Sequence, residues 1–121
     1  MVLQQDCDVR IWGWADPGEK AAVVAEWESE QASVVADENG KWLAEIRTPK
    51  AGGPHTLVVK GKNTVEVKNI LVGEVWLCSG QSNMTWQMYF FGNYVLGGEE
   101  DIKNSTNEKI RYFNVGGKGF G

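Results

Sequence analysis

One serine in the chain lies in a stretch where its hydroxyl would be presented for chemistry. The stretch opens with an apolar run, Val75–Cys78, passes through the small residues Ser79 and Gly80, and then places an amide on each side of Ser82. We expect the run to be a buried strand and Ser82 to lie at the exposed turn after it. Such a turn suits a nucleophile, because attack on a carbonyl carbon needs an accessible hydroxyl and N–H donors for the developing oxyanion.

The same residues also have a purely structural interpretation. Serine is favoured at helix N-termini, where its hydroxyl caps backbone N–H groups. The spacing is not G-x-S-x-G, since Met84 stands where the second glycine would be. The flanking amides, Gln81 and Asn83, either touch a substrate or satisfy backbone groups of the turn. From the local residues alone, both interpretations stay open.

Residues Gly80–Met84, which read Gly-Gln-Ser-Asn-Met, closely resemble the nucleophile block of SGNH-type esterases, in the branch that contains the sialate O-acetylesterases. The resemblance covers most of the chain. Other stretches that resemble the family follow in its order: Met1–Gln5, Ile11–Glu19, Gly40–Trp42 and Ala51–Pro54. After Met84 the resemblance is loose and rests on Ile110–Phe113.

This resemblance implies an activity and its residues. Ser82 would attack the acetyl ester of an O-acetylated sugar or glycan, such as an acetylated sialic acid, and its backbone N–H would help to bind the oxyanion. Gln81 and Asn83 would lie next to the substrate. By the same resemblance the enzyme uses no metal and no organic cofactor. The parent family is secreted or periplasmic, although this chain shows no signal peptide at Met1.

The family's other catalytic blocks do not occur in the sequence. No Asp-x-x-His motif, which would supply the general base, is present, and the one histidine is His55. Loss of a triad member typically lowers the rate about 10⁴-fold. We therefore expect an N-terminal fragment of an esterase, which needs the missing C-terminal part of the hydrolase domain and is inactive alone. The alternative is a non-catalytic β-sandwich module that binds glycan or a partner domain.

The expected fold is mainly β. Residues 1–71, with short strands between turn signals and no amphipathic helix, predict a β-sandwich of the jelly-roll or immunoglobulin-like kind. The resemblance makes residues 72–121 the first strand, turn and helix of a truncated SGNH α/β (flavodoxin-like) hydrolase domain. We expect a helix at Glu99–Lys103, a strand at Ile110–Val115 and a frayed tail at Gly116–Gly121.

Two hairpins are predicted in the first part of the chain. Asn39-Gly40 is a strong hairpin signal and predicts that residues 31–36 pair with residues 41–47. A second hairpin is expected to turn at Gly61–Asn63 and to join residues 55–60 to residues 64–69.

Alternation of side chains along strands predicts the core. Trp42, Ala44 and Ile46 share one strand face and are expected to be buried. Trp12 and Trp14 also share a face, and we expect them to pack inside the sandwich, with sugar stacking as the alternative.

The expected environments of the other apolar residues follow from the stretches in which they lie. We expect Trp76 in the core and Cys78 as a buried free thiol, with a disulfide to Cys7 as the alternative. The aromatic stretch Trp86–Phe91 is expected to pack against the missing part of its domain, with a wall of a sugar pocket as the alternative.

Charge and single residues exclude several functions. A net charge of −4 without a basic run argues against nucleic-acid binding, and no apolar stretch approaches the roughly 20 residues of a membrane span. His55 is expected to be a strand residue that does not pair with Ser82, and one histidine without neighbouring ligands predicts no metal site. Glu74 is expected to be a strand-start residue at the junction of the two domains, with acid catalysis as the alternative.

Overall fold

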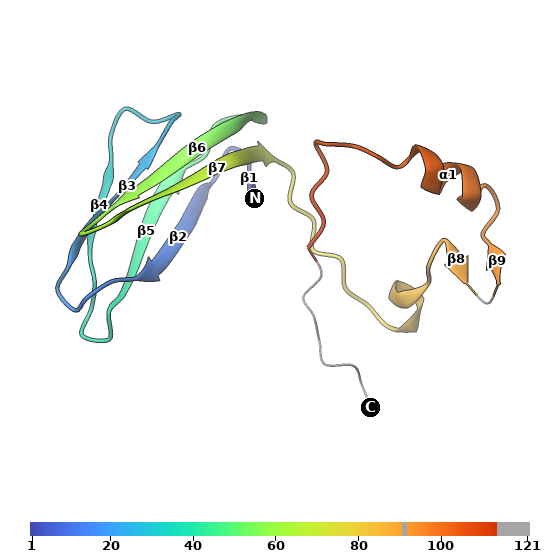
Figure 1. The fold of residues 1–121 in the computed structure, drawn as a ribbon, viewed down its shortest axis with the longest axis horizontal. Helices are drawn as coiled ribbons and strands as arrows, with labels where there is room; N and C mark the ends of the chain where they lie inside the picture. The colour runs from blue at the N-terminus through green and yellow to red at the C-terminus, as the bar shows by residue number, and fades with distance from the viewer. Residues whose placement is uncertain (91, 114–121) are drawn as a thin grey trace. The chain divides into compact units, whose positions relative to one another are not determined.

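The computed structural model describes residues 1–90 and 92–113 (Figure 1). The chain divides into two compact units, Met1–Val75 and the residues from Trp76 onward. The strands of the first unit are β1 (Val2–Gln4), β2 (Asp8–Trp14), β3 (Lys20–Ala25), β4 (Ala32–Val35), β5 (Lys41–Arg47), β6 (Gly52–Lys60) and β7 (Thr64–Gly73). The mainly β class predicted from the sequence is confirmed.

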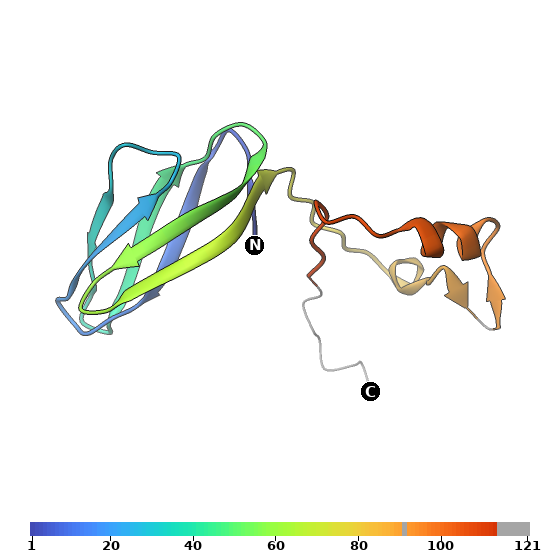
Figure 2. The ribbon, with the colours of Figure 1, turned by 45° about the horizontal axis from the view of Figure 1, so that its top comes forward.

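These strands form two sheets. Five of them make one sheet in the order β1-β7-β6-β3-β4, in which β1 runs parallel to β7 and the other neighbours are antiparallel. Strands β2 and β5 form a separate antiparallel ribbon, the β2–β5 ribbon, which lies over one face of the larger sheet (Figures 1 and 2). The predicted hairpin at Gly61–Asn63 is confirmed, because Lys60 lies opposite Thr64.

The core lies between the larger sheet and the ribbon. Its completely buried side chains, Val23, Leu57 and Ile70, come from the central strands of the larger sheet. The ribbon contributes the predicted face of β5, and its members Trp42, Ala44 and Ile46 are all buried. The two-residue alternation of β5 therefore places one face in the core and leaves the other for solvent.

The Asn39-Gly40 signal predicts the turn correctly and its strand partner wrongly. Strand β5 pairs with β2, whereas β4 pairs with β3 in the other sheet. Gly40 has a φ of +74°, and a Cβ at this position would lie 2.4 Å from the carbonyl oxygen of Ala15. The Ala15 N–H donates to the Gly40 carbonyl over 2.8 Å. The turn is thus fixed against the end of β2, and it carries the chain from one sheet to the other.

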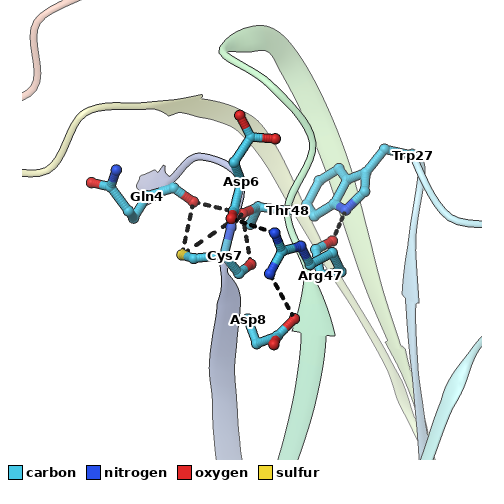
Figure 3. A network of polar contacts seen from close by, with 7 residues as sticks. All are labelled: Gln4, Asp6, Cys7, Asp8, Trp27, Arg47 and Thr48. Atoms are coloured by element: carbon cyan, nitrogen blue, oxygen red, sulfur yellow. Dashed lines mark hydrogen bonds and ion pairs between the residues drawn. The ribbon is translucent and has the colours of Figure 1, made fainter.

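A buried hydroxyl ties the start of β2 to the end of β5 (Figure 3). Thr48 is 2% exposed, and its Oγ1 lies 2.7 Å from the Gln4 carbonyl oxygen and 2.9 Å from the Cys7 carbonyl oxygen. The same atom accepts the Cys7 N–H over 3.1 Å. Beside it, the Arg47 guanidinium donates to the Asp6 carbonyl over 2.5 Å. These contacts satisfy the backbone groups of the corner that joins β1 to β2.

Trp12 and Trp14 lie outside the core, so their predicted burial is wrong. The half-buried side chains of β2 include Val9 and Ile11, which pack against the core, while the two tryptophans are on the opposite face. Alternation correctly groups the two tryptophans, but it does not say which face of a strand meets the larger sheet.

The second unit contains little regular structure among its described residues. Its elements are a 3₁₀ helix η1 (Ser82–Thr85), the paired strands β8 (Tyr89–Phe90) and β9 (Asn93–Tyr94), and the helix α1 (Gly98–Asn104). Helix α1 confirms the helix expected at Glu99–Lys103. Its first turn carries three acids, which suit the positive end of a helix.

The apolar run Val75–Cys78 is not a strand, and this expectation is wrong. Residues 74–80 have no regular structure, Trp76 is 80% exposed, and Cys78 is an exposed free thiol. A buried strand of a parallel sheet needs neighbouring strands for its backbone hydrogen bonds and helices over its two faces, and the described residues of this unit pair only β8 with β9. The side chain of Trp86 is also exposed, and its expected packing against the missing part of the domain stays a prediction.

The strand expected at Ile110–Val115 lies partly within the described residues. Residues 110–113 form no strand, which contradicts the first half of the strand expected at Ile110–Val115. Its remaining residues, and the tail at Gly116–Gly121, lie outside the described residues.

Candidate functional site

Ser82 lies at the first position of η1 with an exposed side chain. The preceding residue, Gln81, has an extended backbone with φ −94° and ψ −156°. The turn is closed by two backbone hydrogen bonds, from Met84 N–H to the Gln81 carbonyl over 2.9 Å and from Trp86 N–H to the Asn83 carbonyl over 3.2 Å. The chain therefore changes from extended to helical geometry at the residue that carries the hydroxyl.

Gly80 and Met84 are in close contact in this turn. A Cβ at Gly80 would lie 2.6 Å from Cγ of Met84, well inside van der Waals contact. The Met84 side chain thus lies against the bare α-carbon of Gly80, and the two ends of the Gly-Gln-Ser-Asn-Met block contact each other. Met84, which stands where a G-x-S-x-G motif would have its second glycine, therefore packs its side chain on Gly80.

The two amides of the block, Gln81 and Asn83, are exposed on either side of Ser82. Their backbone carbonyls close the turn, as described above, so both residues have a structural role. Contact of their side chains with a substrate stays a prediction, as does the nucleophilic role of Ser82.

A polar cluster that the sequence did not predict fixes the chain just before this block. Gln5 Nε2 donates to Glu74 Oε1 over 2.6 Å, and Gln4 Nε2 donates to Glu74 Oε2 over 3.1 Å. Gln4 also accepts the Val75 N–H over 2.8 Å, and Gln5 accepts the Ala51 N–H over 2.8 Å. We call Gln4, Gln5 and Glu74 the glutamine clamp. It holds the last residues of the first unit onto β1.

The clamp also sets the charge state of its carboxylate. The hydrogen bonds from Gln5, and then from Gln4, hold the pKa of Glu74 below its ordinary value, because they stabilise the ionised form. Glu74 follows the last residue of β7, so it is not a strand-start residue. A carboxyl group with a lowered pKa is a poor general acid at neutral pH, which argues against the alternative of acid catalysis.

His55 lies on β6 in the first unit, as expected of a strand residue, and Ser82 belongs to the second unit. The His55 ring contacts Trp27, with centroids 5.2 Å apart and planes inclined by 66°. Cys7 and Cys78 are both free thiols, so the alternative of a disulfide is wrong.

Among residues 1–90 and 92–113, no three His, Cys, Asp or Glu side chains are grouped so that they could hold a metal ion. In the same part of the chain, no helix is long and apolar enough to cross a membrane.

Known proteins resemble this chain in sequence and in structure. No family model matches it. Mouse sialate O-acetylesterase is 33% identical over 126 residues, which covers 95% of this chain and 23% of the mouse protein. Human sialate O-acetylesterase is 34% identical over 94 residues, which covers 69% of this chain and 18% of the human protein.

A solved structure agrees with these relatives. The crystal structure of a carbohydrate acetylesterase from Xanthomonas citri superposes with a TM-score of 0.64 at 41% identity, covering 70% of this chain and 19% of that one. The chain therefore spans less than a quarter of the length of each of these proteins. Because sequence and structure point to the same kind of protein, the chain belongs to the sialate O-acetylesterase family of carbohydrate esterases.

Proposed function

We propose that this chain is the part of a carbohydrate esterase that carries the nucleophile, Ser82, and that the whole enzyme removes O-acetyl groups from sugars. The observation that carries the proposal is the placement of Ser82, exposed at the first residue of a tight turn inside a block that resembles the family's nucleophile block. The relatives named above support the class of substrate, an acetylated sugar or glycan.

The proposed chemistry proceeds through an acyl-enzyme. Ser82 Oγ attacks the acetyl carbonyl carbon, and the backbone N–H of Ser82 is one donor to the oxyanion. Collapse of the tetrahedral intermediate breaks the ester bond, releases the sugar hydroxyl and leaves an acetyl group on Ser82. Water then attacks this group, which releases acetate and restores the serine. Gln81 and Asn83, which are exposed on either side of Ser82, are proposed to contact the sugar.

The general base is proposed to come from an Asp-x-x-His block, which this sequence does not contain. His55, the one histidine, belongs to the first unit, and its ring contacts Trp27. We therefore propose that the chain alone has no serine-dependent turnover, because a serine hydroxyl without a base is a poor nucleophile at neutral pH.

The finer architecture is part of the same proposal. We assign residues 1–71 to a β-sandwich domain and residues 72–121 to the start of an SGNH α/β hydrolase domain, which the rest of the enzyme would complete. For the whole enzyme we propose a secreted or periplasmic location, by resemblance to the family.

A second function, from another class, is a non-catalytic module that binds glycan. The exposed Trp12 and Trp14 favour it, because aromatic rings at a protein surface can stack on sugar rings. Glycan binding that is unchanged by Ser82→Ala, together with no reaction at Ser82 in any context, would support the module over the enzyme.

The proposed reaction is tested by replacing the matched segment of mouse sialate O-acetylesterase with this chain. We expect the chimera to release p-nitrophenol from p-nitrophenyl acetate, and the same chimera with Ser82→Ala to do so about 10⁴-fold or more slowly. The chain alone should show no serine-dependent release. A folded chimera whose rate does not depend on Ser82 would overturn the proposed nucleophile. Serine-dependent turnover by the chain alone would show that it contains a base.

A further inference from the structure

The outer face of the β2–β5 ribbon changes character along its length. At one end, opposite charges pair across the strands: Arg47 with Asp8 over 3.5 Å and Arg10 with Glu45 over 3.8 Å. Toward the other end, the cross-strand partners on the same face are Trp12 with Leu43 and Trp14 with Lys41. The ribbon thus presents an apolar surface, next to a set of neutralised charges.

Three side chains make this surface, which we call the tryptophan platform. Trp12 is 62% exposed, Trp14 is 67% exposed and Leu43 is 54% exposed. The two indole rings are in edge-to-face contact, with centroids 5.1 Å apart and planes inclined by 88°. Each ring therefore restricts the other, and the rings stand ready for a ligand without a large loss of side-chain entropy.

A cation borders the platform. Lys41 lies directly opposite Trp14 in the ribbon, and on a strand face such neighbours have Cβ atoms about 5 Å apart. The ion pairs among the described residues engage the other cations of this face, Arg10 and Arg47, and do not include Lys41. A lysine opposite an exposed tryptophan pair is complementary to a ligand with one apolar face and one anionic group.

The size of the platform favours a small ligand over a protein. With tryptophan side chains of 150–250 Å², the exposed fractions of the three residues amount to roughly 300–400 Å² of apolar surface. A stable protein interface buries about 800 Å² on each partner. The platform is therefore too small for a dimer contact by itself, and it is within the range of surface patches that are functional on single domains.

We infer that the tryptophan platform binds a carboxylated sugar. The C–H face of the sugar ring stacks on Trp12 and Trp14, and the carboxylate of the sugar pairs with Lys41. The inference rests on the proposed function, because it assigns an acidic saccharide to an enzyme that acts on acetylated sugars. It adds a second binding surface on the first unit, separate from the unit that carries Ser82. Such a surface would hold a glycan chain near the esterase independently of the reaction.

The platform is tested by following the six indole N–H resonances in ¹H–¹⁵N NMR spectra during titration with N-acetylneuraminic acid. We expect the Trp12 and Trp14 resonances to shift with a Kd on the order of 1 mM, and the methyl ester, which lacks the negative charge, to bind about 2–5-fold more weakly. Lys41→Gln should reduce the affinity for the acid to that of the ester. Trp14→Ala should weaken binding about 10-fold, whereas Trp76→Ala, at an exposed tryptophan of the other unit, should not.

Three outcomes would overturn the inference. The first is equal binding of the acid and the ester, and the second is no shift of the Trp12 and Trp14 resonances at saturating ligand. The third is a dimer, seen by size-exclusion chromatography, that Trp12→Ala dissociates. Ser82→Ala separates this inference from the proposed reaction: it should leave the platform titration unchanged while it abolishes turnover by the chimera.

Discussion

Replacement of Thr48 by valine tests whether one buried hydroxyl holds the corner between β1 and β2. Valine has nearly the same shape as threonine, so the change removes the hydroxyl and leaves the packing. The hydroxyl has one proton, which it donates to the nearer carbonyl, that of Gln4 at 2.7 Å, and it accepts the Cys7 N–H at 3.1 Å. In Thr48→Val both backbone groups lose this partner.

The expected loss of stability follows from these two hydrogen bonds. Each net hydrogen bond contributes about 1 kcal/mol, and leaving a buried partner unsatisfied adds to it, so we expect Thr48→Val to lower the free energy of unfolding by about 2–3 kcal/mol. For a unit of this size the midpoint of thermal unfolding should fall by roughly 10–20 °C. Thr48→Ser is the matched control, because it keeps the hydroxyl and loses one methyl group, at a cost of about 1 kcal/mol.

Urea unfolding of the full chain, followed by circular dichroism, measures both variants under the same conditions. The reasoning is refuted if Thr48→Val is as stable as the wild type, or more stable than Thr48→Ser. Either result would mean that water or a small backbone shift satisfies the Gln4 carbonyl and the Cys7 N–H.

Two further predictions concern the glutamine clamp and the turn at Gly40. The clamp hydrogen bonds hold the pKa of Glu74 below 4.5, so their contribution is complete above that pH and lost as the pH falls through the lowered value. Corrected for the intrinsic rate, hydrogen exchange at the Val75 amide should therefore accelerate on acidification in the wild type and not in Glu74→Gln; equal acceleration in both would contradict this. Gly18→Ala should cost about 1–2 kcal/mol, because the φ of +76° is strained for alanine but its Cβ meets nothing within 4 Å. Gly40→Ala has similar strain and also contacts Ala15, so its cost in urea unfolding should be clearly larger; equal costs would contradict the contact.

Local patterns in the sequence predicted the parts of the fold that depend on neighbours in the chain. The alternation through Trp42, Ala44 and Ile46 identified a buried face, and the acids at the start of α1 identified a helix. Both signals act over a few residues, where side-chain direction follows directly from the backbone.

Partners and faces were harder to predict, because long-range packing selects them. Asn39-Gly40 specifies a turn, but whether the strands around it pair depends on which edge offers a better ladder, and β5 pairs with β2. Trp12 and Trp14 share a face in any strand, and only the position of the larger sheet decides that this face is outside. The run Val75–Cys78 is apolar enough for a buried strand, but the described residues provide no strand that pairs with it.

In the candidate site, too, local features were predicted and long-range contacts were not. The block that resembles the family's nucleophile block was recognised because its residues are consecutive, and the exposed position of Ser82 in a turn agrees with the expectation. The glutamine clamp was missed because Gln4 and Glu74 are 70 positions apart. The Gln4-Gln5 pair in a stretch that resembles the family was the one signal that could have indicated it.

The most direct measurement of the proposed function is the site at which a fluorophosphonate reacts with the chimera of this chain and mouse sialate O-acetylesterase. Because the reagent needs an activated serine, we expect a single adduct, located on Ser82 by peptide mass spectrometry and absent from Ser82→Ala. An adduct on another serine of a folded, active chimera, or activity that survives with Ser82 unlabelled, would contradict the assignment of the nucleophile.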